Sequence, residues 1–145
     1  MSKILYTAEA TVTGGRQDGR ATTSDGALDV QIGPPKEFSG DGTRTNPEQL
    51  FAAGFAACFE SALSIVAQRQ KLEAADATVI SRVHLHPTEE RGFKLSVEMD
   101  VTMPSVEDAD AAVSLVAATH QVCPYSNATR GNIDVTFTAN GQPVG

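Results

Sequence analysis

The segment that most restricts how this chain can fold covers residues 50–66, which are apolar or small on nearly every face of a helix. Its larger side chains are Leu50, Phe51, Phe55, Phe59, Leu63, Ile65 and Val66. A helix that is hydrophobic all round has to be buried on all sides. A domain of 145 residues seldom encloses such a helix alone. The segment therefore favours a homodimer, in which this helix packs against the partner's sheet or helix.

The start of this helix is marked by a capping box. Asn46 suits the N-cap, Pro47 suits the first helical position, and Gln49 is placed to bond back to the cap. The polar residues 68–71 mark the exit of the helix to solvent. We therefore expect a long helix that begins at Pro47 and leaves the protein interior near residue 68.

Alternating polar and apolar residues predict strands on both sides of this helix. The segments with this period-two pattern cover residues 3–13, 78–86, 92–103 and 133–139. Two shorter strands, residues 20–24 and 27–32, flank Asp25-Gly26, a dipeptide typical of a β-hairpin turn.

A second amphipathic helix is expected after Ser105, its N-cap, with Asp108 three residues on, and it ends before Pro124. The element order is then βββαββαβ, which is typical of an α+β fold with helices on one face of an antiparallel sheet. We expect a single domain over residues 1–145, in which about six strands pack on two main helices.

The charge balance excludes several classes of partner. The formal net charge is -7 and the sequence pI is about 4.8, whereas nucleic acid and anionic membranes need a basic surface. The first residues do not have the pattern of a signal peptide, and no run of about eighteen apolar residues predicts a membrane span. We expect a cytoplasmic protein that binds neither nucleic acid nor membrane.

Two cysteines occur, Cys58 within the apolar helix and Cys123 where the second helix stops before Pro124. They are 123 minus 58, or 65, residues apart, so they form neither a CxxC motif nor a zinc knuckle. A lone helical cysteine is most often a small buried hydrophobe. Spacing alone leaves open whether these two residues meet.

The flanks of both cysteines resemble a known family. Residues 56–63 (AACFESAL) and 122–133 (VCPYSNATRGNI) are similar to the two cysteine motifs of organic hydroperoxide resistance proteins, within the OsmC-like superfamily. Residues 45–54 (TNPEQLFAAG) and 14–16 (GGR) resemble further family segments, so the likeness covers essentially the whole chain. It implies an OsmC-like fold and an intertwined homodimer.

The resemblance also implies an activity, that of a thiol-dependent peroxidase without haem or metal. Cys58 would attack an organic hydroperoxide and become a sulfenic acid, and Cys123 would then resolve it to a disulfide. The reductant implied by the family is a dihydrolipoyl group on a carrier protein, or dihydrolipoamide. The role implied for the protein is defence against oxidative stress.

Two charged residues match the family's site. An apolar site disfavours the Cys58 thiolate, and Arg16 would compensate it while Glu48 holds Arg16. Without the resemblance, a turn arginine is usually solvated, and a glutamate in a first helical turn simply favours the helix dipole. Glu48 lies ten residues before Cys58, which is about 15 Å along a helix. We expect Arg16 and Glu48 to reach Cys58 from the partner subunit, unless Gly54 marks a bend.

Apolar side chains near Cys58 suggest the class of substrate. Five of them could line a channel for alkyl or fatty-acid hydroperoxides, namely Phe38, Phe51, Phe55, Phe59 and Leu63. Ordinary core packing is the alternative. His84 and His86 share one face of a predicted strand, but two ligands are weak support for a metal, and we expect none.

Two other functions stay open from the sequence. One is a catalytically silent dimer that binds an apolar small molecule between its subunits and merely buries its cysteines. The other is a redox sensor, which is less favoured because no DNA-binding or signalling element accompanies the thiols.

Overall fold

The computed structural model describes residues 2–15 and 17–145. The chain divides between Leu50 and Phe51 into two compact units. The expected single domain over residues 1–145 stays a prediction.

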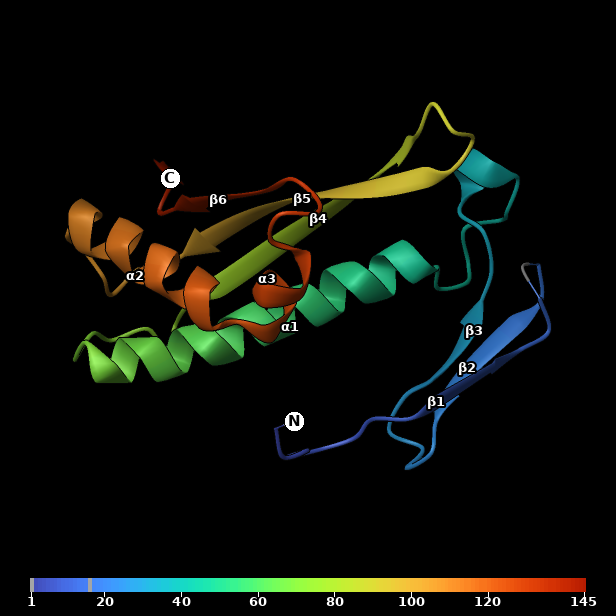
Figure 1. The fold of residues 1–145 in the computed structure, drawn as a ribbon, viewed down its shortest axis with the longest axis horizontal. Helices are drawn as coiled ribbons and strands as arrows, with labels where there is room; N and C mark the ends of the chain where they lie inside the picture. The colour runs from blue at the N-terminus through green and yellow to red at the C-terminus, as the bar shows by residue number, and fades with distance from the viewer. Residues whose placement is uncertain (1, 16) are drawn as a thin grey trace. The chain divides into compact units, whose positions relative to one another are not determined.

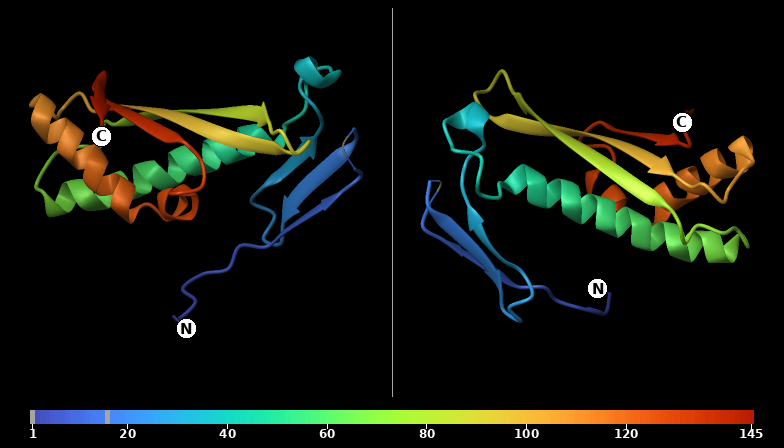
Figure 2. Two further views of the ribbon diagram at one scale, coloured as in Figure 1. Left: turned by 45° about the horizontal axis from the view of Figure 1, so that its top comes forward. Right: turned by 180° about the vertical axis from the view of Figure 1, so that it is seen from behind.

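The first unit contains a three-stranded antiparallel meander, β1 (Ala10–Thr13), β2 (Gly19–Thr23) and β3 (Asp29–Ile32), followed by a short 3-10 helix, η1 (Lys36–Phe38) (Figure 2). The turn between β2 and β3 is held by Asp25, whose carboxylate accepts from the Ala27 amide at 3.0 Å and from the Thr23 hydroxyl at 2.7 Å. Gly26 has a φ of 76°, which a residue without a Cβ adopts readily. The predicted hairpin is confirmed.

The predicted strand over residues 3–13 is wrong for its first part. Only Ala10–Thr13 are in a strand, because the five-residue β2 pairs with β1 from Ala10↔Thr23 to Thr13↔Arg20 and ends there. An alternating pattern predicts a strand but cannot supply its partner. The apolar side chains of Ile4, Leu5 and Tyr6 are consequently exposed to solvent within this chain.

Helix α1 (Pro47–Arg69) begins with the predicted capping box. The Gln49 amide donates to Asn46 Oδ1 at 2.9 Å, and the Asn46 amide donates to Gln49 Oε1 at 3.1 Å. Two amides at the first turn, which have no partner within the helix, are thereby satisfied.

The second unit is built on a four-stranded sheet in the order β4-β5-β6-β7 (Figure 1). These strands are β4 (Thr78–Pro87), β5 (Phe93–Thr102), β6 (Val135–Ala139) and β7 (Gln142–Val144). β4 and β5 form a long antiparallel hairpin, whereas β5 and β6 are parallel. Parallel neighbours need a crossover connection, which here contains α2 (Ala109–Val122) and α3 (Pro124–Thr129).

The mixed α+β class is confirmed, and three details of its prediction are corrected. The expected single antiparallel sheet of about six strands is wrong, because the described residues form two sheets with seven strands and one parallel pair. A third helix, α3, begins at Pro124 itself, because proline cannot continue α2 and suits the first position of a new helix. The cap of α2 is Asp108, which accepts from the Asp110 amide, while Ser105 donates to Asp76.

The hydrophobic core lies in the second unit, between one face of the sheet and helices α1 and α2 (Figure 2). Phe59 stacks on Phe137 of β6 with ring centroids 4.9 Å apart. The opposite face of α1, which carries Ala53, Ala57 and Ile65, is exposed within this chain. The expectation that this helix is buried on all sides is therefore wrong for a single chain.

Length and composition alone would allow α1 to cross a membrane. The central helix of a water-soluble protein has the same properties, and the buried side chains of α1 contribute to the core of the second unit. Packing against the sheet accounts for the apolar character of one face of α1.

The capping box gives a prediction for stability. We expect Asn46→Ala to lower the free energy of unfolding by about 1 kcal/mol, because it removes the acceptor for the Gln49 amide. Asn46→Asp retains an acceptor and should keep most of that stability. Urea titrations of both variants test this, and equal losses in the two would contradict it.

Candidate active site

Cys58 and Cys123 are brought together by the fold of the second unit. Their sulfur atoms are 3.5 Å apart, and both are free thiols. Cys123 is fully buried, whereas Cys58 is partly accessible. One thiol that solvent can reach thus lies in contact with a second that it cannot, an arrangement suited to thiol and disulfide chemistry.

Cys123 is the junction between two helices. Its amide donates to the Thr119 carbonyl at 2.9 Å in the last turn of α2, and its carbonyl accepts from the Asn127 amide at 3.0 Å in α3. It therefore ends α2 and begins α3, with Pro124 as the first residue of the second helix. These two hydrogen bonds fix the backbone of Cys123 and therefore the point from which its side chain extends.

A close approach between α3 and α1 completes the arrangement. A Cβ at Gly54 would lie 3.2 Å from the Tyr125 hydroxyl oxygen, so the tyrosine ring crosses α1 where that helix has no side chain. The same ring lies 5.8 Å from Phe55 and 6.3 Å from Phe51, measured between centroids. Gly54 and Cys58 are four residues apart, which places them on the same face of α1.

The environment works against ionisation of Cys58. Burial raises the pKa of the Cys58 thiol, and the Tyr125 backbone amide lowers it. The neighbouring Cys123 raises it further, first through the hydrogen bond between the two thiols and then through charge repulsion. None of these groups of the described chain is a cation. A nucleophilic thiolate at this position consequently calls for a compensating positive charge.

Arg16 lies outside the described residues. Glu48 is half-buried in the first turn of α1, and α1 continues as an α-helix through Gly54 to Arg69. Glu48 is therefore about 15 Å from Cys58 along the axis of that helix. The catalytic roles of Arg16 and Glu48 stay predictions.

The residues expected to line an apolar channel have different surroundings. Phe55, Phe59 and Leu63 are completely buried in the core, and Phe51 is half-buried beside Tyr125. Phe38 belongs to η1 in the first unit and is 45% exposed. Their role in binding substrate stays a prediction.

The strand histidines each contact a side chain on β5. His84 Nε2 lies 2.6 Å from a Glu98 carboxylate oxygen, and His86 Nε2 lies 2.7 Å from the Ser96 hydroxyl. Within residues 2–15 and 17–145, no group of three or more His, Cys, Asp and Glu side chains is placed to hold a metal ion.

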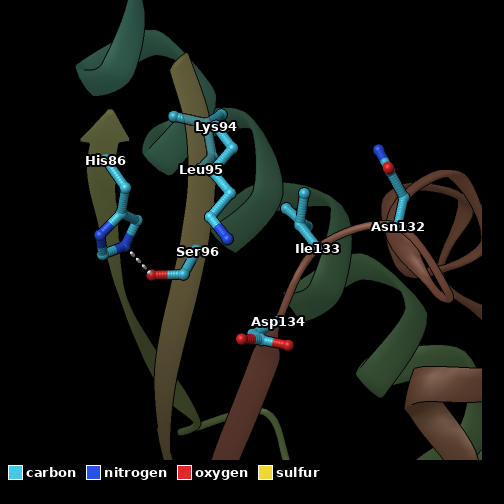
Figure 3. Close-up of a pocket in the computed structure, with 7 residues that line it drawn as sticks. All are labelled: His86, Lys94, Leu95, Ser96, Asn132, Ile133 and Asp134. Atoms are coloured by element: carbon cyan, nitrogen blue, oxygen red, sulfur yellow. Dashed lines mark hydrogen bonds between the residues drawn. The ribbon is translucent and has the colours of Figure 1, made fainter. Parts of the chain in front are cut away.

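A cleft of about 250 Å³ adjoins this pair of strands (Figure 3). It is lined by His86, Lys94, Leu95, Ser96, Asn132, Ile133 and Asp134. Most of its walls are polar or charged, and none of the expected site residues that the structure describes lines it. It does not correspond to the expected apolar channel.

Sequence reasoning missed three residues around Cys123. His120 Nδ1 lies 2.8 Å from the Ser126 hydroxyl, and Arg130 donates both to the His120 carbonyl and to Asn127 Oδ1, the latter at 2.8 Å. Ser126 and Arg130 lie inside the second cysteine motif, and that position was the sequence feature that could have marked them as site residues. Their contacts depend on α3, which was not predicted.

Comparison with known proteins now decides the family. Residues 40–138 match the family described as OsmC-like protein. The chain is 51% identical over 138 residues to the organic hydroperoxide resistance protein of Xanthomonas axonopodis pv. citri, covering 94% of this chain and 95% of that protein. This chain belongs to the organic hydroperoxide resistance proteins of the OsmC-like family.

Solved structures agree with this assignment. An organic hydroperoxide resistance protein from Legionella pneumophila superposes with a TM-score of 0.88 at 49% identity, covering 93% of this chain and 97% of that one. OhrB of Bacillus subtilis gives 0.84 at 46% identity, covering 92% and 98%. The predicted OsmC-like fold is confirmed, and membership of this family supports a peroxidase-like function in defence against organic hydroperoxides.

The surroundings of His120 predict how the stability of the folded protein depends on pH. Burial lowers the pKa of this imidazole below its usual value of about 6.5, and the charge of Arg130 lowers it further. Well above pH 6.5 the ring is neutral in both folded and unfolded chains. As the pH falls below 6.5, the unfolded chain takes up a proton first, so stability is lost.

We expect His120→Gln to remove this acid sensitivity. Between pH 7.5 and pH 5, the wild-type protein should lose more free energy of unfolding than the variant does, measured by urea titration at both pH values. Parallel losses in the two proteins would contradict the lowered pKa of His120.

Proposed function

We propose that this protein is a cysteine-based peroxidase that reduces organic and fatty-acid hydroperoxides to alcohols. The single observation that carries the proposal is the 3.5 Å separation of the Cys58 and Cys123 sulfurs, with Cys58 the more accessible. Family membership supports the same class of activity.

The first step is attack by the Cys58 thiolate on the outer oxygen of the hydroperoxide. The O–O bond breaks, and its electron pair leaves with the inner oxygen, which takes a proton and departs as an alcohol. Cys58 retains the outer oxygen as a sulfenic acid. Its partial exposure suits this role, because a hydroperoxide has to reach the sulfur.

The second step is resolution by Cys123. Its sulfur attacks the sulfenic sulfur, an S–S bond forms, and the oxygen leaves as water after taking up the thiol proton. Contact between the two sulfurs makes this step intramolecular, which favours it over further oxidation of Cys58.

The third step needs an external reductant, for which we propose a dihydrolipoyl dithiol, free or on a carrier protein. Its two thiols exchange with the Cys58–Cys123 disulfide and are themselves oxidised to the cyclic disulfide, so two electrons and two protons pass to the protein. The protein's own chemistry needs neither haem nor metal in this scheme. A reducing compartment is required between turnovers, and we propose the cytoplasm.

We further propose a homodimer in which Arg16 and Glu48 of one chain serve Cys58 of the other. The raised pKa of Cys58 calls for a cation, and ten helical residues separate Glu48 from the thiol on the same chain. Unpartnered surface supports a second copy. The outer edge of β4, the outer face of α1 and the side chains of Ile4 and Leu5 are all uncovered.

An apolar substrate fits the surroundings of the thiol. Phe51 and Tyr125 lie together and are both incompletely buried, so they offer an alkyl chain some aromatic surface next to Gly54. Phe55 and Phe59 are packed behind this surface and shape it from the core. We propose on these grounds that alkyl and fatty-acid hydroperoxides are preferred to hydrogen peroxide.

A single-turnover experiment tests the activity. Reduced protein receives one equivalent of an alkyl hydroperoxide or of hydrogen peroxide, and intact mass with disulfide mapping follows the thiols. We expect a Cys58–Cys123 disulfide to form faster with the alkyl compound, and dihydrolipoamide to restore both thiols. Cys58→Ser should abolish turnover, whereas Cys123→Ser should stop at oxidised Cys58.

Two results would overturn the proposal. If both thiols survive the alkyl hydroperoxide unchanged, a silent binder of apolar molecules becomes the better description. If oxidised protein is reduced equally well by dihydrolipoamide and by a simple monothiol, the proposed class of reductant is wrong while the peroxidase activity stands.

Complementation between chains tests the shared site. Arg16→Met and Cys58→Ser should each be inactive alone, since one lacks the cation and the other the nucleophile. Unfolded together and refolded as mixed dimers, they should regain activity, because one mixed site pairs intact Cys58 with the partner's intact Arg16. Mixing Cys58→Ser carrying Arg16→Met with Arg16→Met is the control. No recovery in the mixed dimers would place both groups in one chain.

A further inference from the structure

The two ends of the α2–α3 junction are tied together by the side chain of Arg130. This residue follows α3, and its guanidinium donates to the His120 carbonyl in the last turn of α2 and to Asn127 Oδ1 in α3, the latter at 2.8 Å. Arg130 therefore spans the junction at which Cys123 lies. Its side chain is exposed, so these contacts are made at the surface.

A second contact between α2 and α3 is made by side chains that are buried or half-buried. His120 Nδ1 is 2.8 Å from the hydroxyl of Ser126, which is completely buried in α3. The His120 ring also packs against Phe137, with centroids 4.8 Å apart, and Phe137 stacks on Phe59 of α1. Phe59, which follows Cys58 in the sequence, thus packs on Phe137, and Phe137 packs on His120, the residue that joins α2 to Ser126 of α3.

We infer that Arg130, His120 and Ser126 form a clasp that positions Cys123 for the resolution step, and that they are positioning residues and not catalytic ones. The inference rests on the proposed peroxidase function. Helix α3 has only six residues, and a helix that short is not stable alone in water. The ties to α2 and to the core therefore hold the segment whose first turn follows Cys123.

The consequence of losing the clasp falls mainly on resolution, because displacing α3 takes away from Cys58 both the Tyr125 amide that lowers its pKa and the Cys123 thiol that raises it. Attack on a hydroperoxide uses Cys58, which is carried by the long helix α1 and does not depend on the junction for its position. Resolution uses Cys123, whose place depends on α2 and α3 together. A displaced Cys123 leaves the sulfenic acid of Cys58 exposed to a second hydroperoxide, which would oxidise it to the sulfinic acid with release of another alcohol.

The chemistry of the guanidinium makes a graded test available. Arg130 bonds two acceptors at once, whereas a lysine ammonium is a compact charge on a flexible stem and a methionine donates nothing. The expected order of resolution rate is wild type, then Arg130→Lys, then Arg130→Met. Arg69→Met is the matched control, because it removes an exposed arginine from the last turn of α1.

The experiment separates the two steps in the full-length protein. After one equivalent of an alkyl hydroperoxide, a sulfenic-acid trap measures attack, and disulfide mapping measures resolution. We expect Arg130→Met to leave attack within about twofold of wild type and to slow resolution by about tenfold or more, the scale of a small misplacement. With excess hydroperoxide, its sulfinic form should accumulate, while Arg69→Met behaves as wild type.

Other outcomes overturn the inference. Unchanged resolution in Arg130→Met, or equal losses in attack and resolution, would show that the clasp does not act on Cys123. Circular dichroism and thermal unfolding check the fold, and Arg130→Lys decides the matter if Arg130→Met does not fold. Failure of the wild-type protein itself to form the Cys58–Cys123 disulfide would instead remove the proposed function.

Discussion

The contact between Tyr125 and Gly54 is the constraint on which the site of this protein depends. A Cβ at residue 54 would lie 3.2 Å from the tyrosine hydroxyl oxygen, a tight contact, so glycine gives the ring room to approach α1 this closely. That approach puts α3 against α1 and lets a cysteine at the start of α3 touch a cysteine one helical turn after Gly54. The two thiols are 65 residues apart in the chain, and their meeting therefore depends on tertiary packing.

The same packing has opposite effects on two properties of Cys58, its protection from solvent and its ionisation. Burial would protect the proposed sulfenic acid from solvent and from other thiols, but it also raises the pKa of Cys58 and disfavours its thiolate. Within the described chain, the Tyr125 amide is the group that lowers this pKa. A neutral donor of this kind offsets only part of the cost of burying a charge. The geometry of the thiol pair is thus complete within the described residues, whereas no cation is among the described groups that set the pKa of Cys58.

The sequence predicted those features that are set by local chemistry. The capping box at Asn46 and the alternation along β5 depend on neighbouring residues alone, and both are confirmed. The parallel pairing of β5 with β6 was not predicted, because which strand becomes the neighbour of β6 depends on tertiary packing and not on the local pattern. The clasp was missed for a related reason, since Pro124 was interpreted as an end and not as the start of α3. The two cysteines were identified from their flanking motifs, although spacing alone left their contact open.

The exposed apolar surface of this chain connects the proposed dimer with the chemistry proposed for its thiols. Helix α1 has a buried face that builds the core and an exposed face that carries Ala53, Ala57 and Ile65. An exposed apolar helix face and an uncovered edge strand are both costly in water, and the described chain has both. A second copy that covers them would also exclude water from the neighbourhood of Cys58, which strengthens any charge interaction made there. A cation supplied with that second copy would then act where it is most effective, and in the dimer proposed above one surface would serve both association and activation of the thiol.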